Sequence, residues 1–317
     1  MLTSSYPILV AERDKWILSQ RPKRNVLDPH RPYAFFVEEE RSAVGEVVPV
    51  ATVFLTNREC PWRCLMCDLW RNTLTETTPA GAIPEQIDYA LSQLPAARQI
   101  KLYNSGSFFD RKAIPPEDYS SIASRVIRFD RTIVECHPSL IGEACLQFRD
   151  LLPNQLEIAM GLETVHPEIL ERLNKRMTLD QFSAAADFLR RNGIDLRVFI
   201  LVQPPFMHPD EALHWAQRSL DFAFNCGASA ATLIPTRSGN GAMDTLIAQG
   251  AFVPPLLKVV EEAAEYGISL DKGRVFVDLW DMPLNADECP HCRDNRLARL
   301  RELNLSQKIL PRMECAH

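Results

Sequence analysis

The chain has 317 residues, of which 46% are hydrophobic, and its formal net charge is −6. This length allows one large α/β domain or two ordinary ones, with enough apolar side chains for a sizeable core. No run of about 18 apolar residues occurs, which argues against a membrane-spanning helix. The first residues meet charge too soon for a secretory signal. We therefore expect a cytoplasmic globular protein without a membrane partner, and the acidity argues against a uniformly basic nucleic-acid binder.

The charge is unevenly distributed along the chain. Residues 1–35 and residues 289–317 each contain six basic and three acidic residues, so the acidity lies between them. Basic ends could contact an anionic substrate such as RNA. Equally, the segment 290–304 could be a basic helix that only keeps the protein soluble.

Between residues 50 and 266, short apolar β-branched runs alternate with longer segments of helical period, which predicts six parallel β/α units. Proline near the helix starts and glycine after the helix ends agree with this assignment. The predicted strands are 50–56, 99–103, 132–136, 156–162, 195–202 and 229–234. The predicted helices are about 84–94, 117–128, 139–150, 180–192, 210–225 and 255–266.

Six units are too few for a complete eight-unit barrel, so the pattern is typical either of a partial (β/α)6 barrel or of a doubly wound sheet. Residues 1–49 are expected to form an irregular N-terminal extension, and residues 50–271 the repeated α/β domain. Residues 272–317 leave the repeat and are expected to form a C-terminal extension.

The strongest chemical signal lies just after the first predicted strand. Cys60, Cys64 and Cys67 have the spacing C-x3-C-x2-C within the segment CPWRCLMCD. A short loop of this kind can bind three irons of a [4Fe–4S] cluster and leave the fourth open to a small molecule. Zinc is the weaker alternative, because three thiols so close together crowd a tetrahedron. The odd count of nine cysteines disfavours disulfides.

The cysteine loop resembles that of the radical S-adenosylmethionine (SAM) superfamily, although Met66 stands where an aromatic residue is common. The resemblance implies an α/β fold with a partial barrel, in which the cluster loop follows the first strand. It also implies an enzyme that uses a [4Fe–4S] cluster to cleave SAM reductively and abstract hydrogen from a substrate. Its partners would be SAM and an electron donor such as flavodoxin or ferredoxin.

A closer resemblance is to the radical SAM subunit of archaeosine synthase, a relative of the elongator catalytic subunit and the methylthiotransferases. It is carried by residues 101–110, 134–138, 156–164 and 248–255, by CPHC at 289–292 and by LSQ at 305–307. This resemblance implies a tRNA substrate with a modified 7-deazaguanine and a radical cleavage at an attached lysine. Cys136 and His137 replace the Ser-Arg pair of that group, which favours a different substrate.

Polar residues near the ends of the predicted strands are candidates for binding SAM, because the chemistry of such barrels occurs at the carboxyl ends of the strands. Asn104, Ser105 and Ser107 could present carbonyls and hydroxyls to the amino group of SAM, although the Gly-Gly-Glu motif familiar in the superfamily is absent. Glu135 and Glu163 end two strands and could bind the sulfonium, amine or ribose of SAM.

Buried charges also have a structural interpretation. Glu135 and Glu163 could instead form salt bridges with Arg197 or Lys101, since a buried carboxylate must be paired. Arg197 is a candidate to clamp the carboxylate of SAM with its guanidinium. Further along, Lys175 and Arg176 could contact an anion or be surface charges.

A second cysteine pair, Cys289 and Cys292, forms a C-x2-C half-site for zinc or for a second iron–sulfur cluster. The alternative is two thiols at a helix start. The residues that could complete a metal site are His291, Cys315, His317 and Cys226.

Taken together, the residues and the resemblance predict a radical SAM enzyme, with the substrate and the catalytic residues unassigned. Two alternatives stay open: a radical SAM maturase acting on a peptide or a small metabolite, and a non-catalytic iron–sulfur protein that binds RNA.

Overall fold

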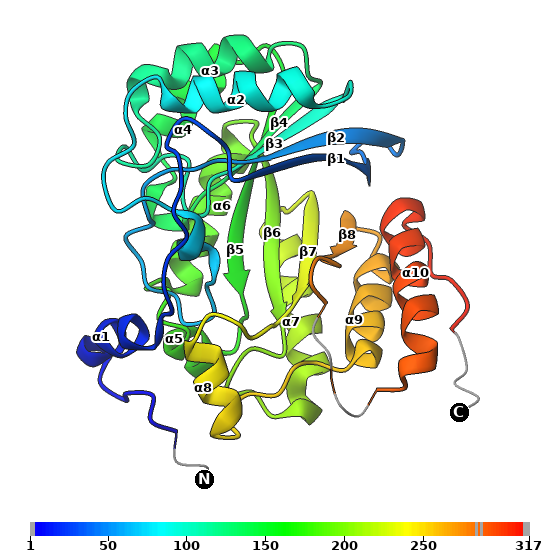
Figure 1. Ribbon diagram of the computed structural model, residues 1–317. Coiled ribbons are helices and arrows are strands. Elements are labelled where there is room, and N and C mark those ends of the chain that lie inside the picture. Colours follow the sequence, from blue (N-terminus) through cyan, green and yellow to red (C-terminus); the bar gives the residue numbers. More distant parts are fainter. Residues whose placement is uncertain (1–3, 283–284, 286–287, 313–317) are drawn as a thin grey trace.

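The computed structural model describes residues 4–282, 285 and 288–312. Its eight strands form one sheet in the order β1 to β8, which curls into a half-barrel (Figure 1). Neighbouring strands from β2 to β8 are parallel, and β1 is antiparallel to β2. The predicted α/β fold with a partial barrel is confirmed.

The strands are β1 Ala34–Arg41, β2 Val47–Phe54, β3 Gln99–Tyr103, β4 Arg131–Glu135, β5 Gln155–Glu163, β6 Asp195–Val202, β7 Ala230–Pro235 and β8 Arg274–Val277. The α-helices are α1 Val10–Gln20, α2 Ala82–Gln93, α3 Tyr119–Val126, α4 Glu143–Leu151, α5 Pro167–Arg172, α6 Leu179–Arg191, α7 Ala212–Asn225, α8 Ala242–Ala248, α9 Leu257–Ser269 and α10 Pro290–Ser306. The six predicted strands correspond to β2 through β7, and the six predicted helices to α2, α3, α4, α6, α7 and α9.

Helix α6 shows why the sequence forms these outer helices. Thr178 and Gln181 form a capping box, which satisfies backbone N–H groups at the helix start. Phe182, Ala185 and Leu189 then recur at helical spacing and are buried. Helices of this kind cover the outside of the sheet, and the main hydrophobic core lies between them and the strands.

Two strands lie outside the predicted six. Strand β1 falls in the segment expected to be irregular, and it pairs with β2 from Ala34↔Phe54 to Arg41↔Val47. Strand β8 falls beyond residue 271, pairs in parallel with β7, and precedes α10, which packs against β1 and β8. The missed β8 has only four residues, too few to show a period. The parallel series is therefore one strand longer than predicted.

Within the described part of the chain, no helix is both long and apolar enough to cross a membrane.

Candidate functional site

The cysteine loop leaves the sheet after β2 and is closed at its base. Leu74 N donates to Asn57 O at 2.8 Å, and Glu59 N donates to Leu74 O at 2.9 Å. Cys60, Cys64 and Cys67 therefore lie on a loop whose two ends are paired at the carboxyl end of β2.

Loops that follow other strands hold the cysteine loop from several sides. A side chain at Gly106, after β3, would place its Cβ 3.2 Å from Cys60 Cβ, so the two backbones approach closely. The ring of Trp62 stacks on that of His137, after β4, with centroids 3.8 Å apart.

The region after β5 and the loop after β7 complete this support. Leu65 N donates to Leu173 O at 2.9 Å. Asn240 donates its side-chain N–H groups to Leu65 O at 2.8 Å and to Cys67 O at 3.1 Å. The cysteines thus lie where the carboxyl ends of several parallel strands converge. Asn240 was not predicted as a site residue, although its Ser-Gly-Asn-Gly setting is a turn signal.

The three thiols lie close enough to influence one another electrostatically. Burial raises the pKa of each of the three thiols to about 12. A second thiol of the loop also raises each pKa: Cys67 acts on Cys60, Cys60 acts on Cys64, and Cys64 acts on Cys67. Among the described residues, no three His, Cys, Asp or Glu side chains come close enough to hold a single metal ion between them. A cubane cluster, however, holds its cysteines on separate irons, so the chemistry of three soft thiol donors on one short loop fits three of its corners.

Glu163 and Lys175 form a buried ion pair beside the thiols. Lys175 Nζ lies 2.6 Å from Glu163 Oε1, and both side chains are less than 10% exposed. Burial alone would lower the pKa of Lys175, but Glu163 and the thiols of Cys64 and Cys60 raise it, so the ammonium stays charged. Glu163 is thus paired, although not with Arg197 or Lys101 as the structural alternative supposed.

Gly161 leaves the space that this ion pair occupies. A Cβ at this position would collide with Glu163 Oε1 and lie 2.5 Å from Lys175 Nζ. We expect Gly161→Ala to displace the pair and to lower the free energy of unfolding by about 1–3 kcal/mol, as overpacking does. Chemical denaturation of the cluster-free protein measures this loss. Gly142→Ala is the matched control, because nothing lies within 4 Å of its Cβ position and its φ of 170° is extended; equal losses in the two variants would contradict the prediction.

Glu135 lies under the loop after β3. Its carboxylate accepts hydrogen bonds from Asn104 N at 2.7 Å and from Gly106 N at 3.3 Å. Burial raises the pKa of Glu135 to about 7, although these backbone N–H groups lower it. The structure therefore brings Glu135 to the predicted Asn-Ser-Gly-Ser turn rather than to Arg197 or Lys101.

The three polar residues of that turn have different environments. Asn104 is fully buried, and within the described structure neither its side-chain oxygen nor its nitrogen has a hydrogen-bond partner. Ser105 Oγ is 2.9 Å from Tyr33 Oη, and Ser107 Oγ accepts from His137 N at 2.9 Å. A buried amide with both atoms unsatisfied is costly, so Asn104 is the residue best explained by a polar ligand.

Arg197 lies elsewhere. It is the third residue of β6, and its guanidinium binds Glu40 at 2.5 Å and Glu157 at 2.6 Å. Both carboxylates are near the amino end of the barrel, since Glu157 is the third residue of β5 and Glu40 pairs with Val48 of β2. The structure does not bring Arg197 to the cysteines, so the expected clamp on a SAM carboxylate is wrong in position.

The C-terminal pair lies at the start of α10, where Cys289 is the residue before the helix and Cys292 belongs to its first turn. Cys226 is at the end of α7, and its thiol lies 3.6 Å from Ser183 Oγ. Two of the residues proposed to complete a metal site, Cys315 and His317, lie outside the described residues. A metal at this pair stays a prediction.

The basic C-terminal helix faces an acidic one. Arg296 binds Glu261 at 2.6 Å, Arg299 binds Glu265 at 2.5 Å, and Arg312 also binds Glu265 at 2.5 Å. These arginines hold α10 and the segment after it against α9. Their charge is therefore used within the chain, which weakens the argument that this end contacts RNA.

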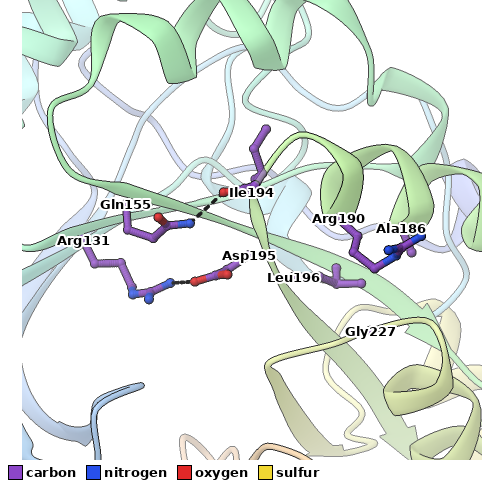
Figure 2. A pocket seen from close by; sticks show the side chains of 9 residues that line it. Arg131, Gln155, Ala186, Arg190, Ile194, Asp195, Leu196 and Gly227 are labelled. Carbon is purple, nitrogen blue, oxygen red and sulfur yellow. Dashed lines mark hydrogen bonds and ion pairs between the residues drawn. The ribbon is translucent and has the colours of Figure 1, made fainter.

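Two pockets flank the barrel. The first, of about 460 Å³, lies at the amino ends of β4, β5 and β6 (Figure 2), where Arg131 and Asp195 point toward one another and pair at 2.5 Å. It is on the end of the sheet opposite to the cysteines. The second, of about 490 Å³, adjoins the cysteine loop and is lined by Trp62, Arg63 and, after β3, Lys112.

A partial barrel of parallel strands with a three-cysteine loop after its first parallel strand defines the class of scaffold. The solved structure of Elp3 from Methanocaldococcus infernus superimposes with a TM-score of 0.51 at 13% identity, covering 69% of this chain and 59% of that one. This likeness shows the shared fold.

Sequence relatives point in the same direction, although no family model matches the chain. It is 25% identical over 308 residues to the uncharacterized protein MJ0550 of Methanocaldococcus jannaschii, covering 90% of this chain and 84% of that protein. It is also 25% identical over 227 residues to archaeosine synthase subunit beta of Methanosarcina acetivorans. That match covers 67% of this chain and 65% of the subunit, so the chain spans just under two thirds of it. Fold and relatives together are consistent with a member of the radical SAM superfamily.

Proposed function

We propose that the protein is a radical SAM enzyme whose Cys60, Cys64 and Cys67 hold a [4Fe–4S] cluster. The observation that carries the proposal is a loop with three cysteines that is fixed at the carboxyl ends of the strands and approaches the turn of Asn104, whose buried amide is unsatisfied. When bound, the cluster and SAM would supply the one-electron chemistry that generates a hydrogen-abstracting radical.

The chain's own residues would bind and orient SAM. The Asn104 amide can donate to a carboxylate or accept from an ammonium group. Lys175 takes the role first given to Arg197, because its buried ammonium lies beside the cysteines and can balance the carboxylate of SAM. Glu135 and Glu163 can accept hydrogen bonds from the amine or the ribose hydroxyls of SAM. Ser105 and Ser107 position the turn through Tyr33 and His137.

Two further residues, Trp62 and His137, would limit the access of water. Trp62 and His137 stack across the loops that follow β2 and β4, and burial lowers the pKa of His137 to about 3, so its imidazole stays neutral. His137 is 3.0 Å from Lys175 O through Nε2. A neutral ring packed in this way protects a reactive radical from solvent without adding a charge.

The finer proposal concerns the substrate. A modified tRNA base is supported by the similarity to archaeosine synthase subunit beta, and a flavodoxin or a ferredoxin would serve as electron donor. The paired arginines of α10 offer this idea no support. The substrate must therefore be recognised by other residues.

Anaerobic reconstitution tests the function. We expect about four irons per chain with the cysteine triplet alone, or about eight if Cys289 and Cys292 hold a second cluster; zinc at that pair would be detected beside the four irons. After reduction with dithionite, SAM should be converted to methionine and 5′-deoxyadenosine, measured by chromatography with and without tRNA. Reduced, iron-loaded protein that forms no 5′-deoxyadenosine in either condition would overturn the proposal.

A further inference from the structure

The interior of the barrel contains a row of touching aromatic rings, here called the aromatic layer: Phe36, Phe54, Tyr103, Phe199 and Trp280. Phe36 stacks on Trp280 with centroids 5.7 Å apart and planes 5° from parallel. The remaining neighbours, Phe36 with Phe54, Phe54 with Tyr103 and Tyr103 with Phe199, have centroids 5.8, 6.1 and 6.2 Å apart.

The contact between Tyr103 and Phe199 shows that the layer faces inward. Their strands, β3 and β6, are separated in the sheet by β4 and β5, so the two rings can meet only across the interior of the curled sheet (Figure 1). Lys101 and Arg197 precede these residues by two positions and share their face. The aromatic layer therefore lies between the buried charges near the amino end and the cysteine loop at the carboxyl end.

These rings are not ordinary core. Phe108, Phe148 and Phe182 on the outer face of the sheet are completely buried. Phe36, Phe54, Tyr103 and Phe199, in contrast, are only half-buried, and Trp280 is 68% exposed. Large aromatic surface left accessible inside a barrel is costly unless something covers it.

Polar atoms adjoin the layer. Tyr33 packs against Phe54 with centroids 5.5 Å apart, and its hydroxyl reaches Ser105 of the site. Thr232 pairs with Phe199 in the register of β6 and β7, and its buried hydroxyl has no partner in the described structure. A ligand that satisfies Thr232 while lying on the rings must combine a flat apolar face with a polar edge.

We infer that the aromatic layer binds the planar heteroaromatic ring of the substrate and so determines specificity. The inference rests on the proposed function for the reaction, since the layer adjoins the site assigned to SAM: Tyr103 precedes Asn104, and Tyr33 reaches from Phe54 to Ser105. Stacking favours flat rings over saturated groups of similar size. A free heterocyclic metabolite and a base presented by RNA share this chemistry.

Binding to the protein, with and without its cluster, tests the inference. Calorimetric titrations would use guanosine and tryptophan as planar probes, cyclohexylalanine as a saturated probe, and a tRNA transcript. We expect a planar probe or the tRNA to bind, cyclohexylalanine to bind more weakly than tryptophan, and Phe199→Leu to weaken binding about five- to tenfold. Binding of a free probe identifies a small heterocycle, and binding of the tRNA alone identifies a base within RNA.

Phe35→Leu is the matched control. Phe35 is adjacent to Phe36 on β1 but faces the other way, where its ring meets Tyr89 of α2. Phe199→Tyr, which keeps a ring, should bind like the parent, and thermal melts check that each variant is folded. The inference fails if Phe199→Leu and Phe35→Leu bind equally, or if cyclohexylalanine binds as well as tryptophan. Binding that depends on Phe199 in a protein that makes no 5′-deoxyadenosine would overturn only the proposed function.

Discussion

Replacing Cys64 with alanine is expected to abolish the formation of 5′-deoxyadenosine from SAM and to lower the iron content after reconstitution. The remaining thiols of Cys60 and Cys67 cannot hold three corners of a cubane. Replacing a residue that hydrogen-bonds to a metal ligand costs about 10- to 100-fold in metal affinity or activity. Loss of the ligand itself should exceed about 100-fold, measured as initial rate of 5′-deoxyadenosine release by reduced protein.

Cys145→Ala provides the control for this loss. Cys145 is buried on α4, and its thiol lies 3.9 Å from Leu140 O rather than in the cysteine loop. This variant should keep the parent's iron content and rate. If Cys64→Ala retains the parent's rate, or if Cys145→Ala loses as much as Cys64→Ala, the three-cysteine site is not the source of the activity.

The positions of Glu135 and Glu163 show what strand patterns can predict. Each is the last residue of its strand, β4 or β5, and the carboxyl ends of parallel strands meet at one end of a barrel. The apolar runs were enough to place both carboxylates at the same level. Their hydrogen-bond partners lie on loops, whose positions a strand pattern does not predict. Glu135 accepts from backbone N–H groups of one loop, and Glu163 pairs with Lys175 on another.

Arg197 shows where the same reasoning failed. Its place as the third residue of an eight-residue strand already put it near the amino end, far from the cysteines. The prediction rested on the chemistry of its guanidinium and not on its position along the strand. Lys175 is the buried cation that the structure places near the thiols, but its burial depends on the space above Gly161, which only the folded backbone reveals.

The basic C-terminal segment is a weaker RNA signal than its sequence suggests, for an electrostatic reason. The prediction weighed the arginines of 289–317 alone, whereas Glu261, Glu262 and Glu265 on α9 lie opposite them. Which helix faces which is a tertiary fact. The acidic residues of α9 can be read from the sequence. Their pairing with α10 depends on strand β8, which lies between the two helices in the chain. With only four residues, β8 is too short to be predicted from its sequence.

The buried charges around Arg197 should be important for stability. Its side chain is 3% exposed and bridges Glu40 on β1 to Glu157 on β5, which also binds Arg131 and Arg274. Arg197→Met removes the bridge, although Glu40 keeps Lys101 and Glu157 keeps Arg131 and Arg274 as partners. We expect the free energy of unfolding to fall by about 1.5–3 kcal/mol, as it does when a hydrogen bond to a charged group is lost.

Acid should weaken the parent in a defined range of pH. Burial alone would raise the pKa of Glu157, but Arg197, Arg274 and Arg131 lower it to about 2 from its ordinary 4.5. Because the folded pKa lies below the unfolded one, this stabilisation is complete above about pH 4.5 and is lost as the pH falls toward 2. In Arg197→Met the pKa of Glu157 should be less depressed, so the free energy of unfolding should depend less steeply on pH below 4.5.

Two further variants separate lost pairing from a general loss of packing. Arg191→Met removes an exposed arginine paired with Asp187 on α6 and should change stability too little to resolve. Arg197→Lys keeps a positive charge between Glu40 and Glu157, so it should be more stable than Arg197→Met. Urea denaturation of all three variants at pH 7 measures these differences. An Arg197→Lys variant no more stable than Arg197→Met would show that Arg197 acts through its volume rather than its charge.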